Sequence, residues 1–222
     1  MLVERSLHPR YLSNAYLVAD EEGGAALYVD SGAPLEPLRA AAERWRVKPQ
    51  LVLRTHSHAD HVEHEGELAL PVETGAAEVG GLRVEALETP GHSDDMIAFV
   101  INGEAVFTGD TLFKYSVGGG NFEQVRQSVM DVLMNLPPET RVLPGHTDET
   151  TIGREWEENP FIRVWRGIEP EGTESVRVAG EDATLIVWSP DYDGGGKAWV
   201  RFPDGRDAIV GGSRVQRGPY GP

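Results

Sequence analysis

The chain has 222 residues, with 36 acidic and 20 basic side chains, a formal net charge of -16 and no cysteine. The missing cysteine excludes disulfides, a thiolate nucleophile and Cys-based zinc or iron–sulfur sites, so a metal would have to be held by histidine and carboxylate. The acidic balance argues against nucleic acid as a partner, because phosphate backbones are bound by an excess of Lys and Arg.

The start of the chain gives no sign of a membrane segment or a signal peptide. Glu4 and Arg5 interrupt the apolar residues before a signal-peptide core could form, and no long uncharged apolar run follows. We therefore expect a cytoplasmic protein without a membrane partner.

The first part of the chain predicts a β-hairpin, a helix and a further strand. The expected elements are strands at 14–19 and 25–30, a helix at 35–45 and a strand at 50–54. Apolar residues recur at helical spacing from Leu35 to Trp45, which is the basis for the helix. The last of these strands runs directly into a polar cluster that begins at Thr55.

The same alternation of strands and polar residues continues along the chain. We expect strands at 82–88, 96–101, 105–108 and 140–143, and helices at 122–136 and 155–165, the second interrupted near Pro160. Asn102-Gly103 predicts a tight hairpin turn between two of the strands. Asn121 is expected to cap the first helix, with Gln124 as its capping-box partner.

The composition changes after Trp165. Residues 167–173 read as a linker. The remainder holds only four short β-type runs joined by Gly, Asp and Pro turns, which predict strands at 175–178, 183–188, 197–202 and 207–210. We expect a small β-barrel or sandwich of about 50 residues. The predicted domains are therefore 1–166 and 167–222.

Three aromatic residues of this C-terminal module, Trp188, Tyr192 and Trp199, raise an alternative role for it. They could form a ligand-binding face, which would make the module a binding or assembly domain. In so small a β-domain, however, aromatic residues more often form the core. The interpretation that we favour is a module that packs against the N-terminal domain or shapes an active-site mouth.

Four polar clusters, each directly after a predicted strand, indicate the chemistry of this sequence. They lie at His56, His92, Asp110 and His146. A rigid sheet can hold such loop residues in a fixed mutual geometry. A lone Pro-Gly-His or Gly-Asp is commonly just a turn, but the combination of all four after strands predicts a shared site.

The first cluster predicts a site for two metal ions. His56 and His58 point to the same side of an extended segment and can bind one ion, whereas Asp60 and His61 lie on the following turn and can reach a second. Four such side chains are costly to bury without a ligand. Two ions about 3.5 to 4 Å apart need a carboxylate between them, and Asp110 suits this role because each of its oxygens can bind one ion. The two remaining histidines of the clusters would complete one site each.

These motifs resemble those of the metallo-β-lactamase-fold hydrolases and, among them, the glyoxalase II-like branch. The resemblance covers roughly residues 11–166 and rests on the motifs at 29–32, 55–61, 89–93, 107–113 and 144–146. It implies an α+β fold, an αββα sandwich with the metals at one edge of its two sheets. It assigns His56, His58 and His92 to the first metal, Asp60, His61 and His146 to the second, and Asp110 to both.

The activity that the resemblance implies is hydrolysis assisted by two divalent cations, Zn²⁺ by preference, with Fe or Mn as alternatives. A water shared by two cations exists as hydroxide near neutral pH and attacks a carbonyl polarised by one metal. Asp60 could orient this hydroxide, and Asp30 could orient a ligating histidine through hydrogen bonds. The expected partner is a small-molecule substrate, a thioester or related ester, and the sequence also allows a homo-oligomer.

The segment after Asp110 departs from the glutathione-thioester hydrolases of this family. Those enzymes carry basic and aromatic residues soon after this motif and a helical C-terminal domain, whereas here 114–122 is rich in glycine and the C-terminus predicts β-structure. Glutathione is therefore not the expected carrier thiol. Lys114 and Tyr115 are close enough in sequence to contact a substrate, although a solvated lysine and a packed tyrosine explain them equally well.

One other activity fits the same motifs. A persulfide dioxygenase resembles this motif set but uses a single iron on residues that match His56, His92 and Asp110. The remaining ligands are often still present in such sequences, so the motifs leave this alternative open.

Overall fold

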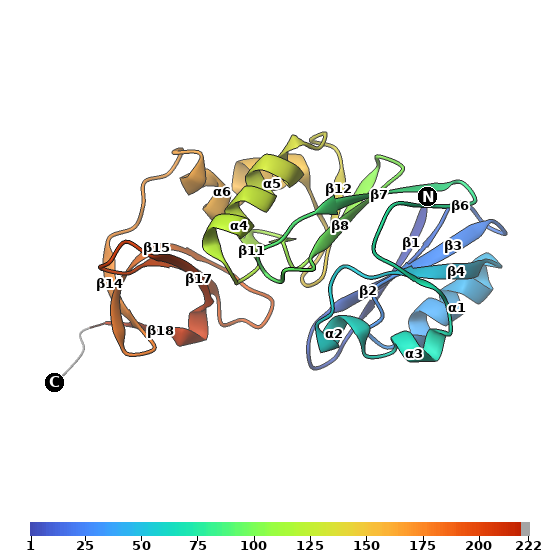
Figure 1. Ribbon diagram of the computed structural model, residues 1–222, viewed down its shortest axis with the longest axis horizontal. Helices are drawn as coiled ribbons and strands as arrows, with labels where there is room; N and C mark the ends of the chain where they lie inside the picture. The colour runs from blue at the N-terminus through green and yellow to red at the C-terminus, as the bar shows by residue number, and fades with distance from the viewer. Residues whose placement is uncertain (219–222) are drawn as a thin grey trace.

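Two β-sheets face each other in the computed structural model, which describes residues 1–218 (Figure 1). The first sheet has the order β1-β2-β3-β4-β5 and consists of β1 (Leu2–Leu7), β2 (Asn14–Ala19), β3 (Ala25–Val29), β4 (Lys48–Leu53) and β5 (Val72–Glu73). The second has the order β13-β12-β9-β8-β7-β6 and consists of β6 (Ala77–Val79), β7 (Leu82–Glu88), β8 (Ile97–Ile101), β9 (Ala105–Gly109), β12 (Arg141–Pro144) and β13 (Thr150–Thr151). The short hairpin β10 (Leu112–Phe113) and β11 (Ser116–Val117) follows β9.

The inner faces of the two sheets form one apolar core. Leu27 and Val29 of the first sheet pack in one buried cluster with Phe99 and Phe107 of the second. Tyr16 belongs to this cluster, and its hydroxyl donates a hydrogen bond of 2.7 Å to the carbonyl of Pro144. The two sheets are thus tied together at the end of β12, directly before the predicted ligand His146.

Helices cover the outer faces of both sheets, which gives the layer order helix, sheet, sheet, helix (Figure 1). They are α1 (Glu36–Trp45), α2 (Ala59–Val62), α3 (Glu65–Leu68), α4 (Phe122–Gln127), α5 (Ile152–Glu158) and α6 (Pro160–Trp165). Leu38 and Ala41 of α1 pack on the first sheet, and Val125 of α4 and Phe161 of α6 pack on the second. None of the helices in residues 1–218 has the length and apolar character needed to cross a membrane.

The helix predicted at 122–136 forms in three consecutive pieces. After α4 the chain continues as a π-helix at Ser128–Val132 and a 3-10 turn at Leu133–Asn135. Asn121 caps α4 as predicted, since its side chain accepts a hydrogen bond from the Gln124 amide. The reciprocal half of the predicted capping box was wrong, because the Asn121 amide donates to the carbonyl of Gly91 instead. The start of this helix is therefore fastened to the loop that carries His92.

The C-terminal module is a five-stranded antiparallel sheet. Its strands are β14 (Glu174–Val178), β15 (Glu181–Ser189), β16 (Lys197–Arg201), β17 (Asp207–Gly211) and β18 (Val215–Arg217), with a 3-10 turn at Gly212–Arg214. The order β17-β16-β15-β14-β18 leaves β17 and β18 at the edges, so the described strands form no closed barrel, contrary to the sequence prediction. β18 has no counterpart among the predicted strands.

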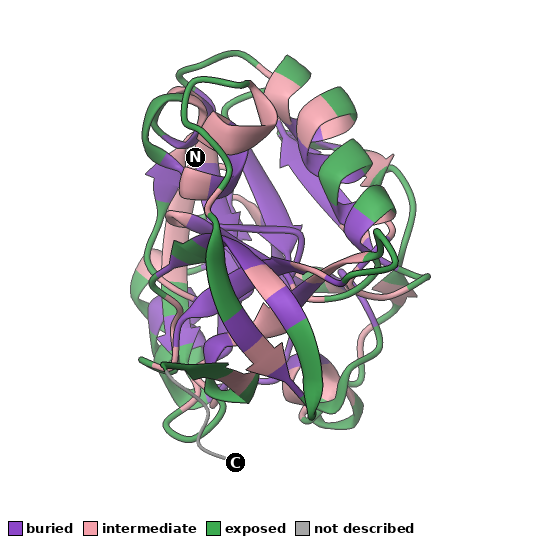
Figure 2. Cartoon of the chain, turned by 90° about the vertical axis from the view of Figure 1, so that its left-hand side faces the viewer, coloured by how far each residue is buried: buried purple, intermediate pink, exposed green. Residues whose placement is uncertain are grey.

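One face of this C-terminal sheet is part of the core of the N-terminal module. Ile186, Trp199 and Ile209 lie in the same buried cluster as Phe161, and the Trp199 ring centre lies 4.8 Å from that of Phe122. The other face has its own apolar cluster, and strands of this sheet face the viewer in Figure 2. The module is therefore packed firmly on α4 and α6, in agreement with the interpretation favoured from the sequence.

Candidate metal centre

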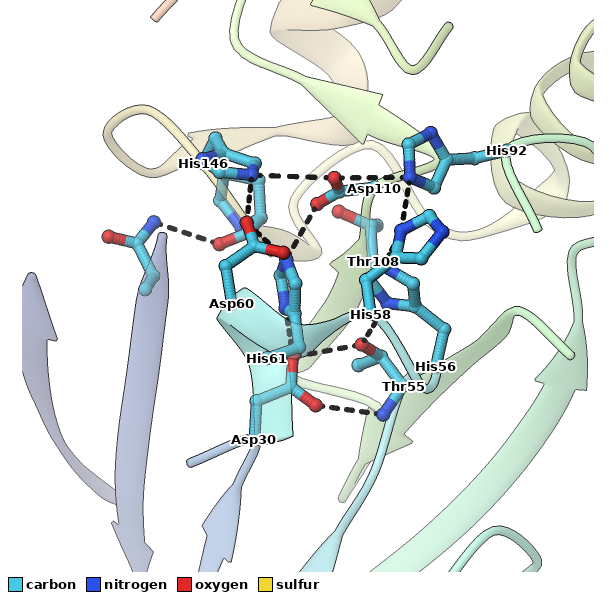
Figure 3. A network of polar contacts seen from close by, with 12 residues as sticks. Asp30, Thr55, His56, His58, Asp60, His61, His92, Thr108, Asp110 and His146 are labelled. Carbon is cyan, nitrogen blue, oxygen red and sulfur yellow. Dashed lines mark hydrogen bonds and ion pairs between the residues drawn. The ribbon is translucent and has the colours of Figure 1, made fainter. Parts of the chain in front are cut away.

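Seven histidine and aspartate side chains converge at one edge of the sandwich (Figure 3). They are the seven that the sequence predicted as metal ligands: His56, His58, Asp60, His61, His92, Asp110 and His146. Each stands in the loop or short helix that follows β4, β7, β9 or β12. The ends of these four strands bring together side chains that are as much as 90 positions apart in the sequence.

The first group consists of three imidazoles. His58 Nδ1 lies 3.0 Å from His56 Nε2 and 3.0 Å from His92 Nε2. The three nitrogen atoms all lie within 4.8 Å of one another. Three histidines at this spacing form a common binding set for zinc, with a further position left open.

The second group consists of two imidazoles and a carboxylate. Asp60 Oδ2 lies 3.5 Å from His146 Nε2 and 3.8 Å from His61 Nε2. His61 and His146 are buried, whereas the Asp60 side chain is 26% exposed. This group is therefore enclosed on its inner side and open to solvent at Asp60.

Asp110 lies between the two groups. Its Oδ2 is 3.5 Å from His92 Nε2 and 3.4 Å from His146 Nε2, and its Oδ1 is 3.4 Å from His61 Nε2. One buried carboxylate thus contacts histidines of both groups, which is the placement that a bridging ligand requires.

Hydrogen bonds to the second ring nitrogen fix the orientation of three of these histidines. His61 Nδ1 donates to Asp30 Oδ2 at 2.8 Å, His92 Nδ1 to the carbonyl of Gly119 at 2.8 Å, and His146 Nδ1 to the carbonyl of Leu12 at 2.9 Å. Each ring then directs Nε2 to the centre, the nitrogen that binds the metal once it is deprotonated. The contact with Asp30 was predicted. The two carbonyl contacts were not, because no side-chain pattern marks them.

Unpartnered buried atoms show that these residues fit a bound cation. Among the described residues, His61 Nε2 and Asp110 Oδ1 are buried and make no hydrogen bond. Nearly all buried polar atoms in proteins are hydrogen-bonded, so two such atoms 3.4 Å apart at one site fit a shared cation. Imidazole and carboxylate are the ligands that suit Zn²⁺, Fe²⁺ and Mn²⁺.

The electrostatic state of the histidines differs between the two groups. Burial, with the neighbouring His61, lowers the pKa of His56 to about 4, and burial also lowers the pKa of His92. Burial acts in the same direction on His146, but the Asp110 carboxylate outweighs it and raises that pKa to about 9. At pH 7 His56 and His92 are therefore neutral and ready to bind a cation, whereas the protein without metal holds a proton on His146 that a cation must displace.

The pKa of Asp110 is also shifted by the histidines that contact it. Burial favours its protonated form, yet the positive charges on His146 and His61 hold the pKa well below the usual range of a carboxyl group. Asp110 is thus ionised throughout the neutral range and available as a ligand.

Gly145 lies between β12 and His146, where the backbone packs closely against the candidate metal centre. A Cβ at this position would collide with the Asp110 carboxylate and would lie 2.7 Å from His61 Cε1. We expect Gly145→Ala to weaken the binding of divalent metal about 10- to 100-fold, the effect typical of disturbing the contacts that support ligands. Competition with a chromophoric chelator measures this, with Gly75→Ala, where a Cβ meets open space, as the control. Equal affinities of the two variants would contradict the prediction.

Glu155 on α5 holds the loop that follows Asp110, a role that no sequence pattern indicated. The side chain is fully buried and accepts hydrogen bonds from the amide of Tyr115, the hydroxyl of Thr150 and the amide group of Asn159 at 2.7 to 2.9 Å. We expect Glu155→Ala to lower the free energy of unfolding by about 2 to 4 kcal/mol, because three buried donors lose their acceptor. Urea unfolding measures this, and exposed Glu157→Ala is the control. A loss no larger than that of the control would refute the role.

The two predicted substrate contacts lie in different surroundings. Lys114 lines a cavity of about 260 Å³ beside His146, whereas the Tyr115 ring lies under the Arg154 guanidinium, with the Arg154 Cζ 5.3 Å from the ring centre. The cavity has another wall that the sequence did not assign to the site: Tyr192 of the C-terminal module stacks on the His146 ring, with ring centres 3.8 Å apart.

Known proteins include relatives of this chain by sequence. No family model matches the chain. A protein of Aquifex aeolicus, described as uncharacterized, is 33% identical, and the match covers 67% of this chain and 90% of the relative. The probable metallo-hydrolase YqgX of Bacillus subtilis is 36% identical over 115 residues, which are 49% of this chain and 50% of YqgX.

Solved structures share the fold. ETHE1 from Myxococcus xanthus is 29% identical with a TM-score of 0.63, over 76% of this chain and 92% of ETHE1. TTHA1623, solved in a di-iron-bound form, is 31% identical with a TM-score of 0.61, over 71% of this chain and 99% of TTHA1623. The B3 metallo-β-lactamase BLEG-1 is 23% identical with a TM-score of 0.65, over 72% of this chain and 99% of BLEG-1, a likeness of fold alone. Part of this chain extends beyond each match.

Proposed function

The chain has the fold of the metallo-β-lactamases, and from this premise we propose that it is a hydrolase that uses two divalent cations to cleave a small thioester or related ester. The observation that carries the proposal is the pair of ligand groups joined by Asp110. The similarity to a probable metallo-hydrolase supports the reaction class.

The proposal assigns each side chain a role toward the cations. His56, His58 and His92 hold the first, Asp60, His61 and His146 hold the second, and Asp110 holds both. When bound, such a pair of cations supplies an acidified water and a Lewis acid that polarises the substrate carbonyl. The protein then needs no side-chain nucleophile, which is consistent with a chain that has no cysteine.

The protein residues around the cations place them and the water. Asp60 is the more exposed of the two carboxylates of the set, so it can accept a hydrogen bond from the attacking water. Asp30 keeps the Nδ1 proton of His61 and thereby directs Nε2 to the centre. Zn²⁺ is the cation that we expect first, with Fe or Mn as alternatives.

The second candidate function is a persulfide dioxygenase with one iron on His56, His92 and Asp110. The likeness to ETHE1 and to a protein solved with two irons favours testing iron. In this chain the distance of 3.5 Å between His92 Nε2 and Asp110 Oδ2 brings two of the three residues together.

Metal analysis combined with two assays distinguishes the candidates. We expect two metal ions per purified chain, hydrolysis of at least one member of a thioester and ester panel, and no oxygen uptake with a thiol persulfide. One iron per chain with oxygen uptake would replace the hydrolase by the dioxygenase. Two bound metals without hydrolysis of any panel member would refute the proposed substrate class.

A further inference from the structure

A loop of the C-terminal module, residues 190–196 between β15 and β16, reaches the candidate metal centre. The Tyr192 ring on this loop lies over the His146 ring at an angle of 10° and meets the edge of Phe113 with ring centres 5.9 Å apart. We propose that this loop completes the active site as one wall of an acyl pocket, and that the pocket selects an acyl group ending in an anion. This inference rests on the hydrolase function proposed above and names its substrate class.

A buried ion pair holds the loop in place. Lys197 Nζ lies 2.8 Å from Asp191 Oδ2, and the two side chains are only 9% and 3% exposed. The same ammonium group lies 5.8 Å from the centre of the Tyr192 ring and 5.9 Å from that of Phe113. Burying two charges costs desolvation energy, so such a pair adds little to stability and is better explained by the unique position that it gives the chain. In this loop the ion pair fixes Asp191, the residue next to Tyr192.

Two further contacts join the C-terminal module to the loop that follows Asp110. The hydroxyl of Ser189, at the end of β15, donates to the hydroxyl of Ser116 at 3.1 Å. Gly120 and Ile209 form a β-bridge. Both partners on the catalytic side lie between Asp110 and α4, so the position of Tyr192 is set relative to the metal ligands themselves.

The cavity beside Tyr192 is lined by apolar residues and by three charged ones, Arg5, Lys114 and Asp148. It has a volume of about 260 Å³ and is lined by Leu7, Leu12, Thr147 and Tyr192 among others. The carbonyl of Leu12 is also the acceptor of the His146 Nδ1 hydrogen bond, so the cavity lies directly beside the second ligand group. A short acyl chain next to a carbonyl at the metals would find apolar contacts here.

Lys114 lines this cavity, and its Nζ lies 5.8 Å from the centre of the Tyr115 ring. The other cation of the lining, Arg5, is already bound, with its Nη1 2.9 Å from Asp148 Oδ1. No carboxylate of residues 1–218 forms an ion pair with Lys114, although the whole chain has a net charge of -16. Asp148, the carboxylate of the lining, is bound to Arg5, so Lys114 is the cation of this cavity that is suited to bind the anionic end of an acyl group.

Binding of succinate and butyrate, which differ by one carboxylate group, tests whether the cavity prefers an anionic acyl group. On the full chain loaded with zinc, calorimetric titration should show that succinate binds at least about 10-fold more tightly than butyrate, the range of a charge-assisted hydrogen bond. Lys114→Gln should abolish this preference, whereas Lys48→Gln, at an exposed position on β4, should keep it. Equal binding of the two acids by the unaltered protein, or an unchanged preference in Lys114→Gln, would overturn the proposal.

Two substitutions of Tyr192 test the wall. Tyr192→Ala should weaken binding of both acids about 10-fold and, with a succinyl thioester, raise KM with little change in kcat, whereas Tyr192→Phe should keep values close to those of the unaltered protein. Elemental analysis should give two metals in both variants. Loss of metal from Tyr192→Ala would show that the ring supports His146 and does not line the substrate site.

The titration also separates this inference from the proposed function. Selective binding of succinate needs no turnover, so a protein that shows it but cleaves no thioester would refute the hydrolase alone. A protein that hydrolyses thioesters without any preference for succinyl over butyryl groups would refute the anionic acyl pocket alone.

Discussion

Asp110→Ala should lose most of its bound metal and its hydrolytic activity together. Asp110 is 5% exposed and is the one carboxylate of the centre that contacts histidines of both groups. Without it the first cation would keep only three imidazoles and the second would lose the ligand that it shares. Loss of a shared ligand should cost more than the 10- to 100-fold weakening typical of a supporting residue, so we expect roughly a 1,000-fold lower activity.

Elemental analysis of protein purified without added metal measures the effect on the centre. Asp110→Asn keeps the volume of the side chain and removes its charge, so it should show the same loss in a chain that still folds. Asp131→Ala, on the exposed side of the π-helix, is the control. Two metals per chain in a folded Asp110→Ala protein would contradict the assignment of Asp110 as the bridging ligand.

The grouping of the metal-site residues could be predicted because its signals are local. Each predicted ligand lies in the segment that follows a run with strand periodicity. The ends of these strands meet at one edge of the two sheets, so the segments that follow them lie close together. His56 and His58 even share a side of one extended segment, which is enough to place them in one group. Local sequence therefore determined which side chains meet.

The contacts that complete the centre depend on pairings between distant segments. The carbonyl of Leu12 accepts from His146, 134 positions later, and Tyr192 reaches the same histidine from a separate sheet. A backbone carbonyl carries no residue signature, and a tyrosine in a loop looks the same whether it packs in a core or borders a site. These contacts could not be predicted without the fold.

The C-terminal module shows the same limit at the level of topology. Alternating residues predicted four of its strands, but closure into a barrel depends on which edges pair. In the structure β18, of three residues, pairs with β14 and leaves β17 at the opposite edge. Trp199, one of three aromatic residues with an open role, lies in the core shared with α4 and α6, while Trp188 is exposed.

Asp30→Ala should weaken both the fold and the second metal position. Asp30 accepts hydrogen bonds of 2.8 Å from the amide and the hydroxyl of Thr55 and from Nδ1 of His61, and all three residues are buried. Its backbone has a φ of 55°, a conformation that Asp and Asn tolerate better than alanine. We expect a loss of about 2 to 4 kcal/mol in the free energy of unfolding, since buried donors lose their acceptor and alanine is strained.

The same substitution should lower the affinity for the second cation about 10- to 100-fold, because the His61 ring loses the partner that fixes its tautomer and orientation. Urea unfolding of the metal-free protein and chelator competition measure the two effects separately. Asp30→Asn suits the backbone and can still accept from Thr55, so it should recover much of the stability, but its neutral amide supports His61 less well and the metal affinity should stay low. Full metal affinity in a folded Asp30→Ala protein would show that His61 is oriented by packing alone.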